Sequence, residues 1–291
     1  MTWKRILTAA VLIPVVVVLV LRGSTATVTL AIALVTLLAL FEYFALGEAI
    51  GHRAYRFWTA TCALVLLYLQ WLAAATPSYE LAGGLTLYGT LGRFFTGLLF
   101  VQDGFFLFVA GIAVITLFTR RPLVEGLPAT GISASALLLV AFPLSFTVRL
   151  QAVPSVGPWL LLFALVITWV GDTAAYFVGR AIGRHALAPH LSPKKTWEGA
   201  VASIAGSLLV AFVFTRWINI APAHLYAMAA VGNVAGQTGD LLESAYKRSA
   251  GVKDSGSLLP GHGGILDRID ALILAIPVVW YYWRLFISSG K

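Results

Sequence analysis

The chain contains few charged residues and almost no cysteine. Asp, Glu, Lys and Arg make up 11% of its 291 residues, whereas a soluble domain carries about a quarter. The single cysteine, Cys62, lies in an apolar run, so neither a disulfide framework nor a cysteine metal site can form within one chain. No separate soluble domain carries a basic stripe, and nucleic acid is therefore not an expected partner.

Apolar sequence is what the chain has in abundance. Hydrophobic residues make up 59% of it, and its mean hydropathy is +0.89. A membrane helix needs about 20 apolar residues, and segments of that length predict an all-α polytopic membrane protein with about nine transmembrane helices, near residues 5–22, 25–46, 57–75, 101–119, 127–148, 158–180, 199–218, 223–243 and 270–288. Residues 81–100 could add a tenth span or lie at the interface, because several glycines and Arg93 weaken this segment.

The distribution of positive charge predicts how the chain crosses the membrane. With nine spans and a cytoplasmic N-terminus, 14 of the 20 Lys and Arg residues fall on the inner side, as the positive-inside rule requires. This arrangement places the polar segments 181–198 and 244–269 in the cytoplasm, whereas a tenth span would move both outside. Lys4 and Arg5 before an apolar run also fit a cleaved signal peptide, although a first transmembrane helix has the same pattern.

A first polar cluster lies inside a predicted span, at Asp172 and Tyr176. An ionised carboxylate within the bilayer is costly and usually faces a cavity or a partner. The two side chains are four residues apart and share a helix face. Asp172 could instead lie at the cytoplasmic end of the span and be solvated.

A second cluster is the sequence SPKKTWEG, residues 192–199. Thr196 can cap the helix that follows, which would bring Lys194 and Lys195 close to a helix N-terminus. Backbone N–H groups, the helix dipole and two ammonium groups together form a good anion site. A positive-inside loop with a helix cap explains the same residues equally well.

A third cluster begins with a polar stripe along one helix face, at Asn233, Gln237, Asp240 and Glu243. Asp267 and Asp270 share a face at the start of the last span. Asp240, Asp267 and Asp270 could thus meet near the cytoplasmic surface, where three carboxylates would need a cation. Oxygen ligands without cysteine favour Mg²⁺, which shares its coordination with substrate phosphates.

Segment 244–269 adds positive charge and glycine backbone beside these acids. Four cations could neutralise phosphates: Lys247, Arg248, Lys253 and Arg268. Gly263 and Gly264 would let backbone approach a ligand closely, and His262 could serve as a hydrogen-bond donor or as a base. A connector with salt bridges is the alternative, but a surface pair contributes only about 0–1 kcal/mol.

The residues of this segment resemble the signature of the phosphatidate cytidylyltransferase family, also called CDP-diacylglycerol synthases. The shared positions are Ser244, Lys247, Arg248, Lys253, Asp254, Pro260, His262, Gly263, Gly264, Asp267, Arg268 and Asp270, and Tyr246 is a mild departure. Two further blocks are similar to the family, at 172–176 and 192–199. The resemblance is strong over 160–275 and divides the chain into a variable transmembrane half, 1–125, and a catalytic half, 126–291.

The resemblance implies a bacterial inner-membrane enzyme whose site faces the cytoplasm. Such an enzyme transfers CMP from CTP to phosphatidate and releases pyrophosphate. The family depends on Mg²⁺, with K⁺ as a second cation, and is similar to a dimeric protein, so a homodimer among membrane lipids is expected. The metal ligands carry over to Asp240, Asp267 and Asp270.

The other site residues implied in this way fall into two groups. The catalytic group is Lys247, Arg248, His262 and Arg268. The substrate-binding group is Asp172, Tyr176, Ser192, Lys194, Lys195, Thr196, Lys253, Asp254, Gly263 and Gly264. The chemistry agrees with a cation-rich site, because the phosphatidate phosphate is already ionised and needs no strong base.

Two rival functions stay open at the level of sequence. A transporter suits the intramembrane acids Asp172 and Asp240, but the polar groups gather at one face and no repeat relates two halves. A CDP-alcohol phosphotransferase carries a longer acidic motif, DG-x2-AR…G-x3-D-x3-D. Here Asp267 and Asp270 are three residues apart rather than four, and DG-x2-AR does not occur.

Overall fold

The computed structural model describes residues 2–75, 101–119, 122–256, 258 and 263–288. They form two compact units, one of Ser24–Ala152 and one of Met1–Gly23 together with Val153–Lys291. Both units are built from helices, which confirms the expected all-α class. A short two-stranded hairpin in the second unit is the one departure among the described residues.

The Ser24–Ala152 unit is a helical bundle with an apolar core. Its elements are α2 (Thr25–Ala49), α3 (Arg56–Ala75), α5 (Val101–Phe118), the 3-10 turn η2 (Leu123–Glu125), α6 (Gly126–Ala136), the π-helical turn η3 (Leu137–Ala141) and α7 (Phe142–Gln151). Ser24 begins α2 by accepting a hydrogen bond from the Thr27 N–H at 3.1 Å. Phe44, Leu66 and Leu144 are fully buried between α2, α3 and α7.

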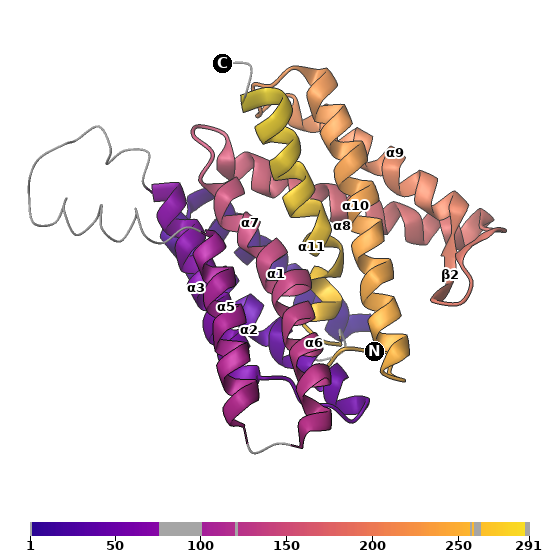
Figure 1. Cartoon of the computed structure of the whole chain (residues 1–291). Coiled ribbons are helices and arrows are strands. Elements are labelled where there is room, and N and C mark those ends of the chain that lie inside the picture. The colour runs from indigo at the N-terminus through magenta and orange to yellow at the C-terminus, as the bar shows by residue number, and fades with distance from the viewer. Residues whose placement is uncertain (1, 76–100, 120–121, 257, 259–262, 289–291) are drawn as a thin grey trace, which may run out of the picture. The chain divides into compact units, whose positions relative to one another are not determined.

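The second unit carries all three polar clusters. Its elements are α1 (Thr2–Arg22), α8 (Gly157–Ile182), β1 (Ala186–Ala188), β2 (Ser192–Thr196), α9 (Trp197–Phe214), α10 (Pro222–Ser249), α11 (Leu266–Tyr282) and the π-helical turn η4 (Trp283–Ile287). Helix α9 packs on α8 and α10, and α11 runs beside α10 (Figure 1). Phe163 and Ile167 of α8 are fully buried in the core of this unit.

Glycines allow the helices of the second unit to approach closely where the polar groups lie. A Cβ atom on Gly239 of α10 would lie 2.5 Å from the carbonyl oxygen of Asp270 on α11. A Cβ atom on Gly171 of α8 would lie 2.4 Å from Nδ2 of Asn233. Neither position can accept a side chain without a shift, so glycine at both brings the polar turns of α8, α10 and α11 together.

The expected membrane character is confirmed by helix length and composition. Seven helical segments of the described chain are long and apolar enough to cross a membrane: Thr25–Ala49, Arg56–Ala74, Val101–Phe118, Leu123–Gln151, Gly157–Ile182, Trp197–Phe214 and Leu266–Ile287. The apolar stretch of α1, Ala10–Arg22, is shorter than these seven segments. Helix α10 carries the polar stripe and is not one of the seven. Nine spans and a cytoplasmic N-terminus stay predictions, and 81–100 lies outside the described residues.

The two polar segments are shorter than predicted as loops. In 181–198, α8 continues to Ile182, and β1 and β2 form an antiparallel hairpin in which Ala186 pairs with Thr196. In 244–269, α10 continues to Ser249 and α11 begins at Leu266. The compact units divide at residues 23 and 152, whereas the proposed division at 125 concerns catalysis and stays a prediction.

Candidate functional site

The polar stripe of α10 begins as a buried network with α9. Asn233 is buried, and its Nδ2 donates to Ser203 Oγ at 2.9 Å. Gln237 Nε2 donates to Asn233 Oδ1 at 2.7 Å and to the Ala200 carbonyl oxygen at 3.2 Å. These bonds join α10 to α9 and fix the rotation of α10 one turn before Asp240.

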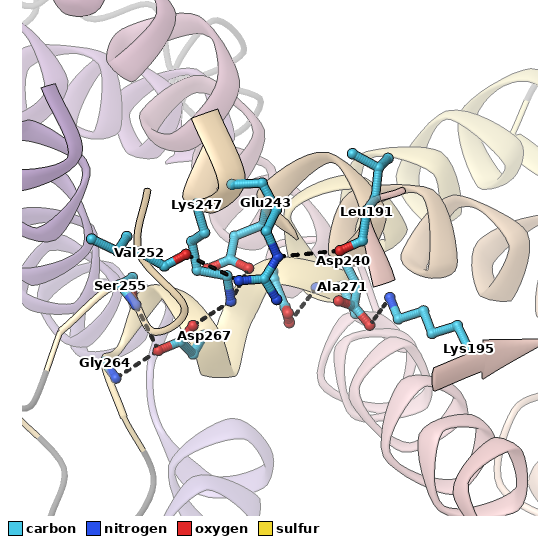
Figure 2. Close-up of polar contacts among 12 residues, drawn as sticks. Leu191, Lys195, Asp240, Glu243, Lys247, Val252, Ser255, Gly264, Asp267 and Ala271 are labelled. Atoms are coloured by element: carbon cyan, nitrogen blue, oxygen red, sulfur yellow. Dashed lines mark hydrogen bonds and ion pairs between the residues drawn. The ribbon is translucent and has the colours of Figure 1, made fainter. Parts of the chain in front are cut away.

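Asp240 forms an ion pair with the hairpin between α8 and α9. Thr196 Oγ1 accepts from the Gly199 N–H at 3.1 Å, which confirms the predicted cap of α9. The preceding lysine, Lys195, extends from β2 and places its Nζ 2.5 Å from Asp240 Oδ2 (Figure 2). The second and third clusters of the sequence therefore meet at this pair, which is partly open to solvent.

Lys247 lies between two buried carboxylates. Its Nζ is 2.5 Å from Glu243 Oε2, one turn earlier in α10, and 2.6 Å from Asp267 Oδ1 on α11 (Figure 2). Burial acts to lower the pKa of Lys247, but hydrogen bonds and charge attraction with Asp267 and Glu243 outweigh it. The pKa therefore lies above its usual value, and the ammonium stays charged.

The second oxygen of Asp267 binds the backbone of the segment before α11. Asp267 Oδ2 accepts from the Ser255 N–H at 3.0 Å and from the Gly264 N–H at 2.8 Å. Between them, Gly263 has φ of +79°, and a Cβ atom there would lie 2.7 Å from Asp267 Oδ2. Position 263 thus favours glycine for two reasons: its backbone is in the left-handed conformation, and it lies very close to a carboxylate.

Asp270, one turn further along α11, lies among other acids. Its Oδ1 accepts from the Ala271 N–H at 2.8 Å. Asp240, Glu243 and Asp172 are all close enough to act on Asp270 electrostatically. Lys195 and Arg268 are the cations that act on Asp172 in the same way. Carboxyl groups therefore gather between α8, α10 and α11, beside the paired lysines Lys195 and Lys247, and such a group of acids favours a bound cation.

The oxygen donors fit a magnesium ion in part. In the part of the chain that the structure describes, no group of three or more Asp, Glu, His or Cys side chains is arranged to hold a metal. Asp267 uses both oxygens for Lys247 and backbone N–H groups. Asp240 and Asp270 remain as oxygen donors, and Mg²⁺ commonly needs only one or two carboxylates beside substrate phosphates. The three-acid site stays a prediction.

The other expected site residues lie around this centre. Arg248 is exposed, and it donates from Nε to the Leu191 carbonyl oxygen at 3.4 Å and from a terminal nitrogen to the Val252 carbonyl oxygen at 3.1 Å. Tyr176 is exposed, and its hydroxyl accepts from Arg180 at 3.0 Å. Further exposed residues are Asp172, Lys194, Lys253, Asp254 and Arg268, whereas Ser192 is half-buried. His262 lies outside the described residues.

Sequence reasoning placed Glu243 on the polar stripe but gave it no role. In the structure its carboxylate is 5% exposed and pairs with Lys247. The spacing of four residues between an acid and a lysine could have suggested this pair once α10 was extended beyond residue 243. Nothing in the sequence pattern pointed to Ser203 or to the backbone of Ser255 as partners.

Comparison with known proteins gives consistent similarities. The sequence model of the cytidylyltransferase family matches residues 3–286. Several relatives bear the name phosphatidate cytidylyltransferase, and three of them illustrate the range of similarity. The one from Haemophilus influenzae is 43% identical over 45% of this chain and 47% of its own length. The one from Staphylococcus saprophyticus is 46% identical over 43% and 49%, and the one from Brucella suis is 37% identical over 69% and 74%. The chain thus spans about half the length of the first two.

Proposed function

The chain belongs to the cytidylyltransferase family, and we propose that it transfers CMP from CTP to phosphatidate, giving CDP-diacylglycerol and pyrophosphate in phospholipid biosynthesis. The observation that carries this proposal is the family match over residues 3–286, which includes every residue of the polar centre. The names of the relatives support phosphatidate as the acceptor.

The charges of the centre suit a reaction between two polyanions. A phosphate oxygen of phosphatidate attacks the α-phosphorus of CTP, and the bond to the bridging oxygen breaks as pyrophosphate leaves. The attacking oxygen is already ionised, so positioning and charge neutralisation are what the protein must supply. Lys195, Arg248 and Arg268 are half-buried or exposed cations that can reach phosphates at this end of α10 and α11.

Magnesium and a second cation such as K⁺ are part of the proposal. When bound, Mg²⁺ would neutralise the CTP phosphates and make the α-phosphorus more electrophilic. We assign Asp240 and Asp270 to it, because their carboxylates lie in the acid-rich region between α8, α10 and α11. Asp267 was expected as a third ligand, but its oxygens accept from Lys247 and two backbone N–H groups.

The proposed setting is the inner membrane of a bacterium. Nine spans with a cytoplasmic N-terminus would place 14 of the 20 Lys and Arg residues inside, and CTP is found on that side. The lipid tails would stay in the bilayer while the phosphatidate head group reaches the hairpin and α10. We also propose that the protein forms a homodimer.

The test uses the purified full-length protein in lipid nanodiscs. With phosphatidate, Mg²⁺ and CTP labelled at the α-phosphorus, we expect label to enter the lipid and pyrophosphate to appear in equal amount. Diacylglycerol in place of phosphatidate, or ATP in place of CTP, should give neither product. If no lipid is labelled while the protein drives ion uptake into vesicles, the proposal is wrong and a transporter is favoured.

A further inference from the structure

We infer that Glu243, Lys247 and Asp267 form a bridge that positions residues 252–255 and 263–265, described parts of the loop between α10 and α11, and that Glu243 is a positioning residue of this site. We call these three side chains the Lys247 bridge. For its kinetic consequences the inference rests on the proposed function. Lys247 was expected to be a catalytic cation and Asp267 a metal ligand. In this inference both residues instead hold the loop that carries Lys253, Asp254 and Gly263.

The burial of the Lys247 bridge indicates that its side chains bind one another rather than a substrate. The side chains of Glu243, Lys247 and Asp267 are 5%, 12% and 7% exposed. By contrast, those of Lys195 and Asp240 are 27% and 30% exposed. Lys247 Nζ already lies within 2.6 Å of two carboxylate oxygens, so two of its three donors are used inside the protein. Lys195 is therefore the better placed of the two lysines for a phosphate.

The contacts of Asp267 show what the bridge holds. One oxygen receives Lys247, and the other receives the N–H groups of Ser255 and Gly264, nine residues apart in the loop. A single carboxylate thus binds the backbone at two points, at Ser255 directly after Lys253 and Asp254, and at Gly264 two residues before α11. Because Lys247 fixes this carboxylate from α10, the loop is held against two helices at once.

Charge explains why Glu243 is needed as well as Asp267. The N–H groups of the loop and the Lys247 ammonium all converge on Asp267, and burial of a lysine with a single weak partner would be costly. Glu243 supplies a second carboxylate one helical turn away, at 2.5 Å. Both carboxylate oxygens of Glu243 are buried and form no hydrogen bond of good geometry among the described residues, so the ion pair with Lys247 is the interaction that offsets the burial of Glu243.

The first experiment measures the loop and needs no activity. Lys253 is exposed in the segment that the bridge holds, and trypsin cleavage after it can be followed by mass spectrometry on the full-length protein in nanodiscs. We expect Lys247→Met to accelerate this cleavage by tenfold or more and Glu243→Gln by a few fold. The double variant should be no faster than Lys247→Met alone, because both changes break the same bridge. Lys247→Arg should restore slow cleavage.

A matched control separates the bridge from a general loss of charge. Glu198→Gln removes another carboxylate of the same unit, whose partner is His185 at 2.7 Å, and it should leave cleavage after Lys253 unchanged. Cleavage in the bridge variants that stays at the wild-type rate would overturn the inference. Equal acceleration at sites throughout the protein would also overturn it, since the bridge would then support the whole unit rather than the loop.

The second experiment separates a positioning role from direct phosphate binding. If Lys247 positions the loop, Glu243→Gln and Lys247→Met should each lower kcat and also make the loop easier for trypsin to cleave. The effects of the two substitutions should then not be additive. If Lys247 binds phosphate, Glu243→Gln frees its ammonium, so that the KM for CTP is unchanged or lower while Lys247→Met alone is impaired. Absence of CTP turnover in the wild type would instead remove the proposed function, and the cleavage rates would still decide the bridge.

Discussion

The two compact units bury polar groups of different kinds. Among the described residues of Ser24–Ala152, the buried polar side chains are neutral: Thr36, Thr59, Gln70, Ser133, Ser145, Thr147 and Gln151. Its ion pairs of His52 with Glu125 and of Glu48 with Arg53 and Arg56 join side chains that are each more than a quarter exposed. The second unit buries charge, with Glu243 at 5% exposure and Lys247 and Asp267 close behind. Both units have apolar helices, so hydrophobicity alone does not separate them.

The difference indicates which unit buries charged groups that serve function rather than stability. Neutral amides and hydroxyls can be buried at little cost when they are hydrogen-bonded, whereas a buried ion pair often stabilises no more than apolar packing would. Charges gathered among membrane helices are therefore a mark of function. Matched substitutions in the two units test whether this contrast holds.

The largest effect is expected from removing divalent cations. Addition of a chelator should abolish CTP turnover, because the acids around Asp270 would repel the CTP phosphates. Thermal unfolding of the Ser24–Ala152 unit, followed by hydrogen exchange, should not change. Readdition of Mg²⁺ should restore turnover, and full activity in excess chelator would contradict the proposed metal site.

Next in size is the loss of either assigned metal ligand. Asp240→Asn and Asp270→Asn should lower kcat by about a hundredfold or more, the scale seen when one preorganised electrostatic contact is lost. Glu48→Gln in the first unit is the matched control and should leave kcat within about twofold. Pyrophosphate release at saturating CTP is the measurement. Activity near the wild-type level in Asp270→Asn would remove that residue from the site.

Breaking an ion pair should affect the stability of the two units very differently. Lys247→Met leaves two buried carboxylates and should lower the free energy of unfolding by about 3–5 kcal/mol. Arg56→Met breaks the more exposed pair with Glu48 and should cost only about 0–1 kcal/mol. Chemical denaturation in mixed micelles measures both. Similar values for the two variants would mean that burial does not distinguish the units.

The smallest expected contrast concerns buried amides. Asn233→Ala and Gln70→Ala each leave hydrogen-bonding partners unpaired and should each cost about 1–3 kcal/mol. Only Asn233→Ala should also reduce kcat, because it loosens α10 from α9 about two turns before Asp240. Equal kcat in the two variants at matched stability would show that the network of Asn233 has no influence on the site.

Much of the helical framework follows from the sequence, because hydrophobic length and helix caps are local signals. The predicted span 25–46 corresponds to Thr25–Ala49, and 101–119 to Val101–Phe118. The cap at Thr196 was likewise predicted. The end of α10 differs from the predicted end at residue 243, because the charged residues Lys247 and Arg248 suit the last turn of a helix as well as they suit a loop.

The partners within the site could not be predicted in the same way. Asp240 at the end of one predicted span and Asp267 and Asp270 at the start of the next suggested one metal cluster, but the partners of each carboxylate depend on side-chain direction and loop backbone. Asp267 turns toward Lys247, Ser255 and Gly264, whereas Asp240 meets Lys195 from a hairpin 45 residues earlier. Contacts between distant segments such as these leave no periodic pattern in the sequence.

The most direct test of the account is transfer of labelled CMP from CTP to phosphatidate by the purified protein and by its Asp240→Asn variant. We expect the wild-type protein to form labelled CDP-diacylglycerol and pyrophosphate in a 1:1 ratio, as the reaction requires, and the variant to form almost none while keeping its fold. Equal rates in the two proteins, or no labelled lipid from the wild type, would contradict the claim that the charged centre around Asp240 serves cytidylyl transfer.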